Sequence, residues 1–295
     1  MRKLFFLLGL CCSLFSVAQT ADGDSVVQVL RAELAYNLSQ LRQRPVPAYF
    51  MSLRLADIRS ASVSSTLGAA TASTSRQRMV TPQIRIGSPQ LDNYKYVNQG
   101  SGAQPGQRNV QGEPVPIEGL TLPALRQAVW NETLRRYQIA VTQYEQARSK
   151  MLTGTDNEDQ APCFSAAPVE QYYEAPLDAR TGDIDLEAWK QRLNQVSAVF
   201  LQCPDIDDGK LDLDVETTRN YLVNSDGTTV VQNRHSARII MSASIKAVDG
   251  MVCPLYQDYF ALSVDRLPDV ATLRSDALRL IERLKALRTA PVADP

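Results

Sequence analysis

Histidine is nearly absent from this sequence: His235 is the only one among 295 residues. Zinc enzymes need two or three His, Cys, Asp or Glu ligands and a carboxylate base, and no HExxH-type pair is present. Cysteine is also scarce, and the three that follow the first 18 residues are widely spaced and match no metal motif: Cys163, Cys203 and Cys253. The sequence therefore predicts no catalytic residue, metal site or cofactor within this chain.

Two chemical roles for His235 stay open. It could join the three cysteines in a zinc site if the fold gathers all four side chains, or it could assist a Cys or Ser nucleophile. The alternative is an ordinary residue at a turn or strand end, because it lies between two expected strands. An odd number of cysteines allows at most one disulfide and leaves a spare thiol.

The sequence has no excess of either charge sign, because it contains 31 basic and 32 acidic residues. A net charge of −1 gives no electrostatic footprint for nucleic acid. The sequence GSG at 100–102 lacks the flanking strand and helix of a phosphate-binding loop. The acidic run 205–216 has its glycine at position five rather than six, so it is no EF-hand loop. These patterns give no support for nucleic-acid, nucleotide or calcium binding.

The chain opens with a basic start and an apolar run at 4–15, which is too short to span a bilayer comfortably. Small residues at 16–18 resemble a signal-peptidase site. We therefore expect a signal peptide at 1–18 and a mature protein that begins at Gln19. The protein should be exported to the periplasm or outside the cell, without stable membrane insertion.

Apolar residues at three- and four-residue intervals predict helices, and alternation predicts strands. The expected helices are 24–44, 122–151, 185–200 and 270–287, and the expected strands after residue 200 are 211–216, 219–224, 229–233, 238–248 and 255–262. Stretches 97–120 and 153–183 are expected loops. Together they predict an α+β fold over 19–295, in which helices pack on a mostly antiparallel sheet with long hairpins.

Residues 49–86 are expected to form a long β-ribbon with a basic tip at Arg76 and Arg78. Pro82 cannot donate a ladder hydrogen bond, so its strand is predicted at a sheet edge or a bulge. Residues 60–78 hold few bulky apolar side chains, and burial of these cannot offset the backbone ordering cost. The ribbon is therefore expected to need a partner surface: a second copy, a homologue or a missing half of the protein.

The same stretch resembles a known family. The segments are YFMSLRLADIRSASVSSTLGA, SRQRMV, IRIGSPQLDN and YVNQGSG, and they are similar to the N-terminal half of TldD/PmbA-type proteins, predicted zinc metallopeptidases also labelled modulators of DNA gyrase. Further similar segments are PIE at 116–118, WNETLRRYQIAVTQYEQARSK, RNYLVNSDGTTV, IKAVDGM and the final helix with APV.

The resemblance implies a role. Family members carry a HExxxH zinc helix in their C-terminal half, so zinc is expected only there, and this chain alone is expected to be inactive. The N-terminal half helps to form a dimer and can grip an extended peptide as an added strand. Expected partners are a TldD/PmbA-like subunit, in a homo- or hetero-oligomer, and a peptide substrate. The candidate contacts are Arg54, Arg76, Arg78, Ile84 and Arg85.

A different class of function is also open: a stand-alone exported binding or assembly module that pairs with a full-length homologue. DNA downstream of the Pro295 codon separates the two hypotheses. A HExxxH helix encoded there indicates half an enzyme, whereas a firm stop followed by an unrelated gene favours the module.

Overall fold

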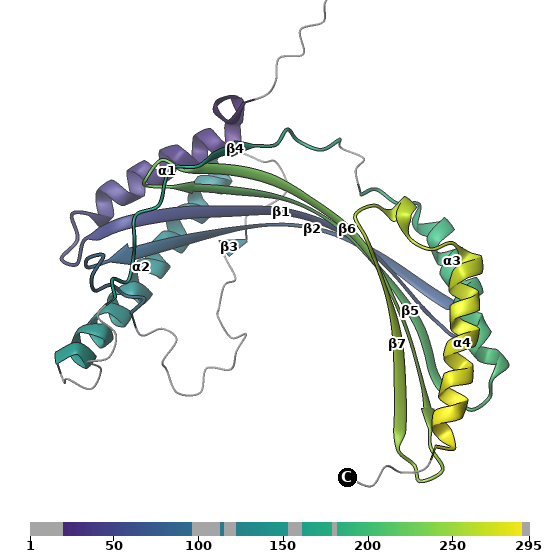
Figure 1. Cartoon of the computed structure of the whole chain (residues 1–295). Coiled ribbons are helices and arrows are strands. Elements are labelled where there is room, and N and C mark those ends of the chain that lie inside the picture. The colour runs from purple at the N-terminus through teal and green to yellow at the C-terminus, as the bar shows by residue number, and fades with distance from the viewer. Residues whose placement is uncertain (1–19, 96–112, 115–121, 153–160, 179–181, 291–295) are drawn as a thin grey trace, which may run out of the picture.

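A computed structural model describes residues 20–95, 113–114, 122–152, 161–178 and 182–290. One long curved sheet forms an arch, and a pair of helices packs near each end of it (Figure 1). The predicted α+β class with a mostly antiparallel sheet is confirmed. No helix in the described ranges is long and apolar enough to cross a membrane. The predicted signal peptide and nearly all of the loop 97–120 lie outside the described residues.

Seven described strands form the sheet in the order β3-β2-β1-β5-β6-β4, with β7 also paired to β6. All pairs are antiparallel except β4 with β6. The four longest strands have 18 or 19 residues, far above the usual five or six. The bounds are β1 Ala48–Thr66, β2 Ala69–Ile86, β3 Glu113–Pro114, β4 Gln171–Tyr173, β5 Ile206–Asn224, β6 Thr229–Lys246 and β7 Val252–Ala261.

Three of the four described α-helices begin after an aspartate that caps them. The carboxylates of Asp24, Asp185 and Asp269 accept hydrogen bonds from backbone N–H groups in the first turns of α1, α3 and α4, which is the usual N-cap role. The helices are α1 Ser25–Leu41, α2 Leu122–Leu152, α3 Leu186–Ser197 and α4 Val270–Arg288. Short 3-10 helices lie at Ala21–Gly23, Ala198–Gln202 and Val264–Arg266.

Two hydrophobic cores lie on one face of the sheet. Leu53 of β1 and Val223 of β5 belong to the core under α1 and α2, whereas Val63 and Leu213 of the same strands belong to the core under α3 and α4. The register between these strands is unbroken from Ser52 onward. Because side chains alternate between faces with a period of two, these odd-numbered residues share one face. We call the opposite face, which carries no described helix, the bare face.

The predicted basic tip at residues 76–78 is wrong. The chain reverses at Leu67 and Gly68, whose φ angles are 49° and 86°, as a two-residue hairpin turn with two left-handed residues requires. Arg76 and Arg78 lie within β2, opposite Arg59 and Asp57. The sequence misled because small Ser, Thr and Ala residues occupy both faces of the hairpin, which leaves no alternation to locate the turn.

Two predicted breaks are also wrong. The expected strands 211–216 and 219–224 are one strand, β5, and the strands 229–233 and 238–248 are one strand, β6. His235 therefore lies within a strand rather than between two. The polar residues at these points suggested loops, but they face a polar part of the sheet described below. The short strand β4 lies within the expected loop 153–183.

Most of the surface that the ribbon packs against belongs to this chain itself. β1 pairs with β5 from Ser52 to Thr66, and β1 and β2 also contact α3. The expectation that this ribbon needs an external partner is therefore wrong for β1. β2, in contrast, pairs on its outer side only through Met79 and Val80 in the described residues, so the predicted edge position of Pro82 is confirmed.

Candidate functional site

The outer side of β2 has no described strand partner over most of its first half. Residues 69–77 have β1 on one side and no described strand on the other. Nearly all their side chains are exposed. Natural edge strands are usually protected by lysine, proline or a bulge, but residues 69–77 have only one charge, Arg76, and no proline. We call residues 69–77 the β2 edge.

Small hydroxylated side chains flank this edge on the bare face. Ser60 and Ser75 hydrogen-bond across the strands at 2.7 Å between their Oγ atoms, and Ser62 and Ser73 do so at 2.9 Å. On the helix side, the edge borders a hollow of about 380 Å³. It is lined in part by Thr74, Ser75, Arg76, Arg59 and residues 182–184. A chain paired with the β2 edge would therefore meet few bulky side chains.

Two of the predicted contact residues, Arg54 and Ile84, have opposite environments. Arg54 is exposed on the bare face. Ile84 is only 2% exposed and packs in the core under α1 and α2. Its side chain is already occupied by contacts within this chain, because alternation in β2 points it inward. Arg54 alone of these two presents its side chain to solvent.

Arg76 and Arg78 converge on Asp57. Arg78 donates to Asp57 through Nε at 2.6 Å and also through Nη2, and Arg76 donates from Nη2 at 3.2 Å. Burial alone would raise the pKa of Asp57, but the hydrogen bonds from the two arginines outweigh it and hold the pKa below its usual value. Arg78 is buried, and its Nη1 atom has no hydrogen-bond partner. Arg76 remains exposed beside the β2 edge.

This ion pair belongs to a polar belt across the sheet. The belt lies on the helix side between the two cores, and it consists of Asp57, Arg59, Arg76, Arg78, Thr217, Arg219, Asn233 and His235. Arg219 donates to Asn233 Oδ1 at 2.8 Å and to Asp24 Oδ2 at 3.4 Å. Its guanidinium also lies 5.4 Å from the ring centroid of Tyr173. The belt thus ties α1 and β4 to the centre of the sheet.

Arg85, the fifth predicted contact, holds a different cluster together. Its guanidinium lies 4.5 Å from the ring centroids of both Tyr94 and Phe164 and pairs with Asp92. Asp92 is fully buried and also accepts a hydrogen bond from Tyr49 at 2.8 Å. Arg85 therefore fixes the chain after β2 to the segment around Phe164. The structure separates Arg85 from the Asp57 cluster instead of joining all five predicted contacts in one site.

His235 lies in the polar belt, where its Nδ1 is 2.8 Å from Thr217 Oγ1. Gly182 passes close to this pair with φ +86°, and a Cβ there would lie 2.2 Å from Thr217 Oγ1. Cys163, Cys203 and Cys253 are free thiols in the described chain. Within the described ranges, no group of three His, Cys, Asp or Glu residues is placed to hold a metal ion.

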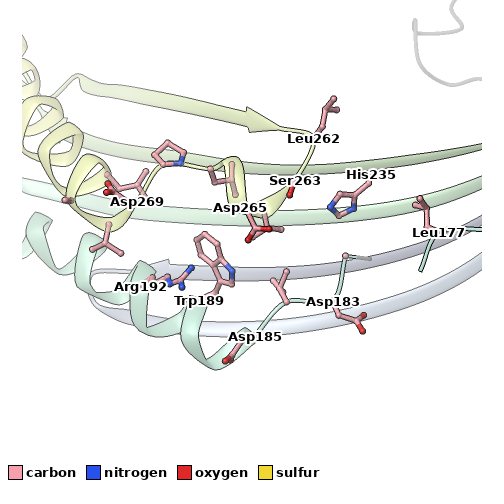
Figure 2. Close-up of a pocket in the computed structure, with 18 residues that line it drawn as sticks. Leu177, Asp183, Asp185, Trp189, Arg192, His235, Leu262, Ser263, Asp265 and Asp269 are labelled. Carbon is pink, nitrogen blue, oxygen red and sulfur yellow. The ribbon is translucent and has the colours of Figure 1, made fainter. Parts of the chain in front are cut away.

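A larger cavity opens beside His235 (Figure 2). It lies between the first turns of α3 and α4, and its volume is about 1120 Å³. Trp189 and Arg192 come from α3, and Asp265 comes from the 3-10 helix before α4. Sequence reasoning missed this cavity, and it also missed Asp57. The sequence does contain one signal for the Asp57 cluster, a carboxylate in one expected strand and two arginines in the next. The strand register that brings them together could not be derived from the sequence.

No protein-family model and no curated protein matches the chain. Solved structures do match. TldE from Thermococcus kodakarensis is 10% identical with a TM-score of 0.50, and the match covers 86% of this chain and 47% of that one. A "putative modulator of DNA gyrase" from Bacteroides thetaiotaomicron is 9% identical with a TM-score of 0.52, and the match covers 94% of this chain and 52% of that one.

The chain thus spans about half the length of these two proteins. At such low identity the likeness concerns the fold. The chain therefore has the fold of about half of a TldE or DNA-gyrase-modulator-type protein, which confirms at the level of the fold the TldD/PmbA resemblance predicted from its sequence.

Proposed function

We propose that this chain is a non-catalytic part of an exported TldD/PmbA-like metallopeptidase. In this proposal it binds an extended peptide as an added strand on the β2 edge and assembles with a TldD/PmbA-like subunit. Zinc and the catalytic residues belong to a different part of the assembly. The half-length match to TldE and the modulator protein supports the statement that the chain is part of a TldD/PmbA-like protein.

The β2 edge is the observation that carries the peptide-binding proposal. Nine residues have no described strand on their outer side, and at about 3.4 Å each they offer about 30 Å of strand edge to an incoming chain. Each main-chain hydrogen bond contributes about 1 kcal/mol net, while ordering the peptide costs about 1–2 kcal/mol per residue. Binding should therefore be weak. The small side chains along the edge provide few specificity pockets, so binding should also tolerate many sequences.

Assembly with a second subunit is supported by apolar side chains on the bare face of β7. Tyr256 is 74% exposed and Phe260 is 66% exposed. Both side chains lie on the bare face, because they pair across from Ser242 and Arg238 of β6. Val252, on the same face, is also exposed. Apolar patches of this kind on a protein surface often mark interaction sites.

Neighbouring proline substitutions test the peptide-binding proposal. In an antiparallel edge strand, successive N–H groups point alternately to the paired strand and to the open side. Of Ser73→Pro and Thr74→Pro, one therefore removes an open donor and the other removes a donor used by β1. The ligand is a fluorescently labelled, end-blocked peptide of alternating Thr and Val, and binding is measured by fluorescence polarisation.

We expect the open-side variant to keep its urea midpoint and bind the peptide at least about tenfold more weakly, because it removes a main-chain donor and the proline ring blocks the peptide from the edge. The other variant should lose stability. Unchanged peptide affinity in a fully folded open-side variant would contradict strand addition at this edge.

A further inference from the structure

The cavity beside His235 is lined by a largely buried tryptophan whose indole N–H has no acceptor among the described residues. Trp189 is only 6% exposed, yet its indole nitrogen hydrogen-bonds to no described residue. In the described residues, the buried side-chain polar atoms without a hydrogen-bond partner are Arg78 Nη1, Arg85 Nε and Thr133 Oγ1. The Trp189 nitrogen is not one of them, so it is accessible from outside the protein core. It therefore opens to the cavity, and Figure 2 shows it turned toward the interior. Because this N–H faces the cavity and has no described acceptor, it is free to donate to an acceptor on a bound molecule.

The described lining is acidic. Four aspartates are among the described lining residues, and Arg192 is the one arginine among them. Asp185 and Asp269 are already used as helix caps. Asp183 and Asp265 have no hydrogen bond or ion pair with any described residue, so their charges are available to a cation.

Arg192 offsets only one of these four negative charges. Its guanidinium lies 4.9 Å from the ring centroid of Trp189 and stacks on the indole. The stacking holds the ring in place and leaves its edge, with the nitrogen, toward the cavity. Leu262, Leu267 and Pro268 add an apolar wall. A volume of about 1120 Å³ is somewhat above the usual range for small-molecule sites, about 300–1,000 Å³, so a ligand would fill only part of the cavity.

We propose that this cavity binds an amine-bearing peptide or amino-acid amide. A ligand carbonyl accepts a hydrogen bond from the Trp189 indole N–H, and the ligand ammonium group pairs with Asp265, with Asp183 adding negative potential at the rim. The ammonium group can come from a peptide N-terminus or from a lysine side chain. This inference concerns residues apart from the β2 edge, so it stands without the proposed function.

Tryptophan makes the proposal directly measurable, because the chain has only Trp130 and Trp189. In Trp130→Phe, the single indole N–H signal in a ¹H–¹⁵N spectrum reports on Trp189. Three probes are titrated separately: alanyl-alanine amide with a free terminal amine, N-acetyl-lysine methylamide with a side-chain amine, and neutral N-acetyl-alanine methylamide.

We expect a saturable shift of the Trp189 signal with at least one amine probe at up to about 10 mM, and none with the neutral probe. The amine probe that gives the shift identifies the source of the ammonium group. In the same background, Asp265→Asn should weaken binding about tenfold, because a charge-assisted contact is lost. Asp226→Asn, in an exposed hairpin turn, should have no effect.

No saturable shift with either amine probe, or an equal shift with the neutral probe, would overturn the proposal. Equal affinity of Asp265→Asn and the parent would overturn the assigned ion pair. The probe comparison uses the unaltered cavity, so it decides the question even if an aspartate variant fails to fold.

Discussion

Removing the charge of Asp57 should destabilise the centre of the sheet. Asp57→Asn keeps the shape of the side chain but leaves Arg78 without its counter-ion. The Arg78 side chain is only 7% exposed and that of Asp57 is 16% exposed. Breaking a buried ion pair from one side costs about 3–5 kcal/mol. Since the asparagine carbonyl can still accept one hydrogen bond from Arg78, we expect a loss of about 3 kcal/mol.

Urea unfolding measures this loss. With a slope of roughly 3 kcal/mol/M for a chain of this size, the midpoint should fall by about 1 M. The matched control is Asp258→Asn, which breaks the surface pair with Arg238, and it should leave the midpoint nearly unchanged. In the double variant Asp57→Asn/Arg78→Met, most of the lost stability should return, because no buried charge is left unpaired.

The pH dependence provides an independent check. The arginines hold the folded-state pKa of Asp57 below its usual value. Its contribution to stability is therefore present above the unfolded-state pKa, near 3.9, and is lost as the pH falls through the folded-state pKa. The difference between the parent and Asp57→Asn should thus shrink below about pH 4. A midpoint change smaller than that of Asp258→Asn, or a difference that grows in acid, would refute this reasoning.

Other predictions concern export, metal and packing. Mass spectrometry of the exported protein should find Gln19 at the N-terminus, whereas an intact N-terminus in a soluble cytoplasmic form would contradict export. The purified protein should bind no stoichiometric zinc, and near-unit zinc that is lost in His235→Ala would overturn this expectation. Phe200→Ala should lower the free energy of unfolding by about 3–5 kcal/mol, because Phe200 is fully buried. The substitution Leu201→Ala, at an exposed neighbouring residue, should have little effect on the free energy of unfolding. Equal losses for the two variants would contradict the placement of Phe200 in the core under α3 and α4.

Hydrophobic periodicity predicted the helices and the fold class well. The helix expected at 122–151 is found as Leu122–Leu152, and that expected at 270–287 is found as Val270–Arg288. Periodicity works there because each helix places one apolar face against a core. The same signal failed in the long strands, where the polar belt interrupts the alternation at residues 217–219 and 233–235.

The candidate sites were harder to predict because they depend on register. Asp57 and Arg78 are 21 residues apart in sequence, and only the turn at Leu67–Gly68 places them opposite each other. Because the turn was predicted at the wrong position, Arg78 was expected at an exposed tip, whereas it forms a buried ion pair. The cavity at Trp189 lies between the first turns of α3 and α4. The local sequence pattern of each helix does not predict how the two helices pack against each other.

Amide hydrogen exchange along residues 69–77, with and without the blocked Thr–Val peptide, tests the proposed peptide binding most directly. In the free protein, alternate amides that face β1 should be protected, and the amides that face the open side should exchange fast. The peptide should slow exchange at the open-side amides of this stretch, as expected when a strand is added. Binding that leaves these amides in fast exchange, with protection only elsewhere in the protein, would contradict the account.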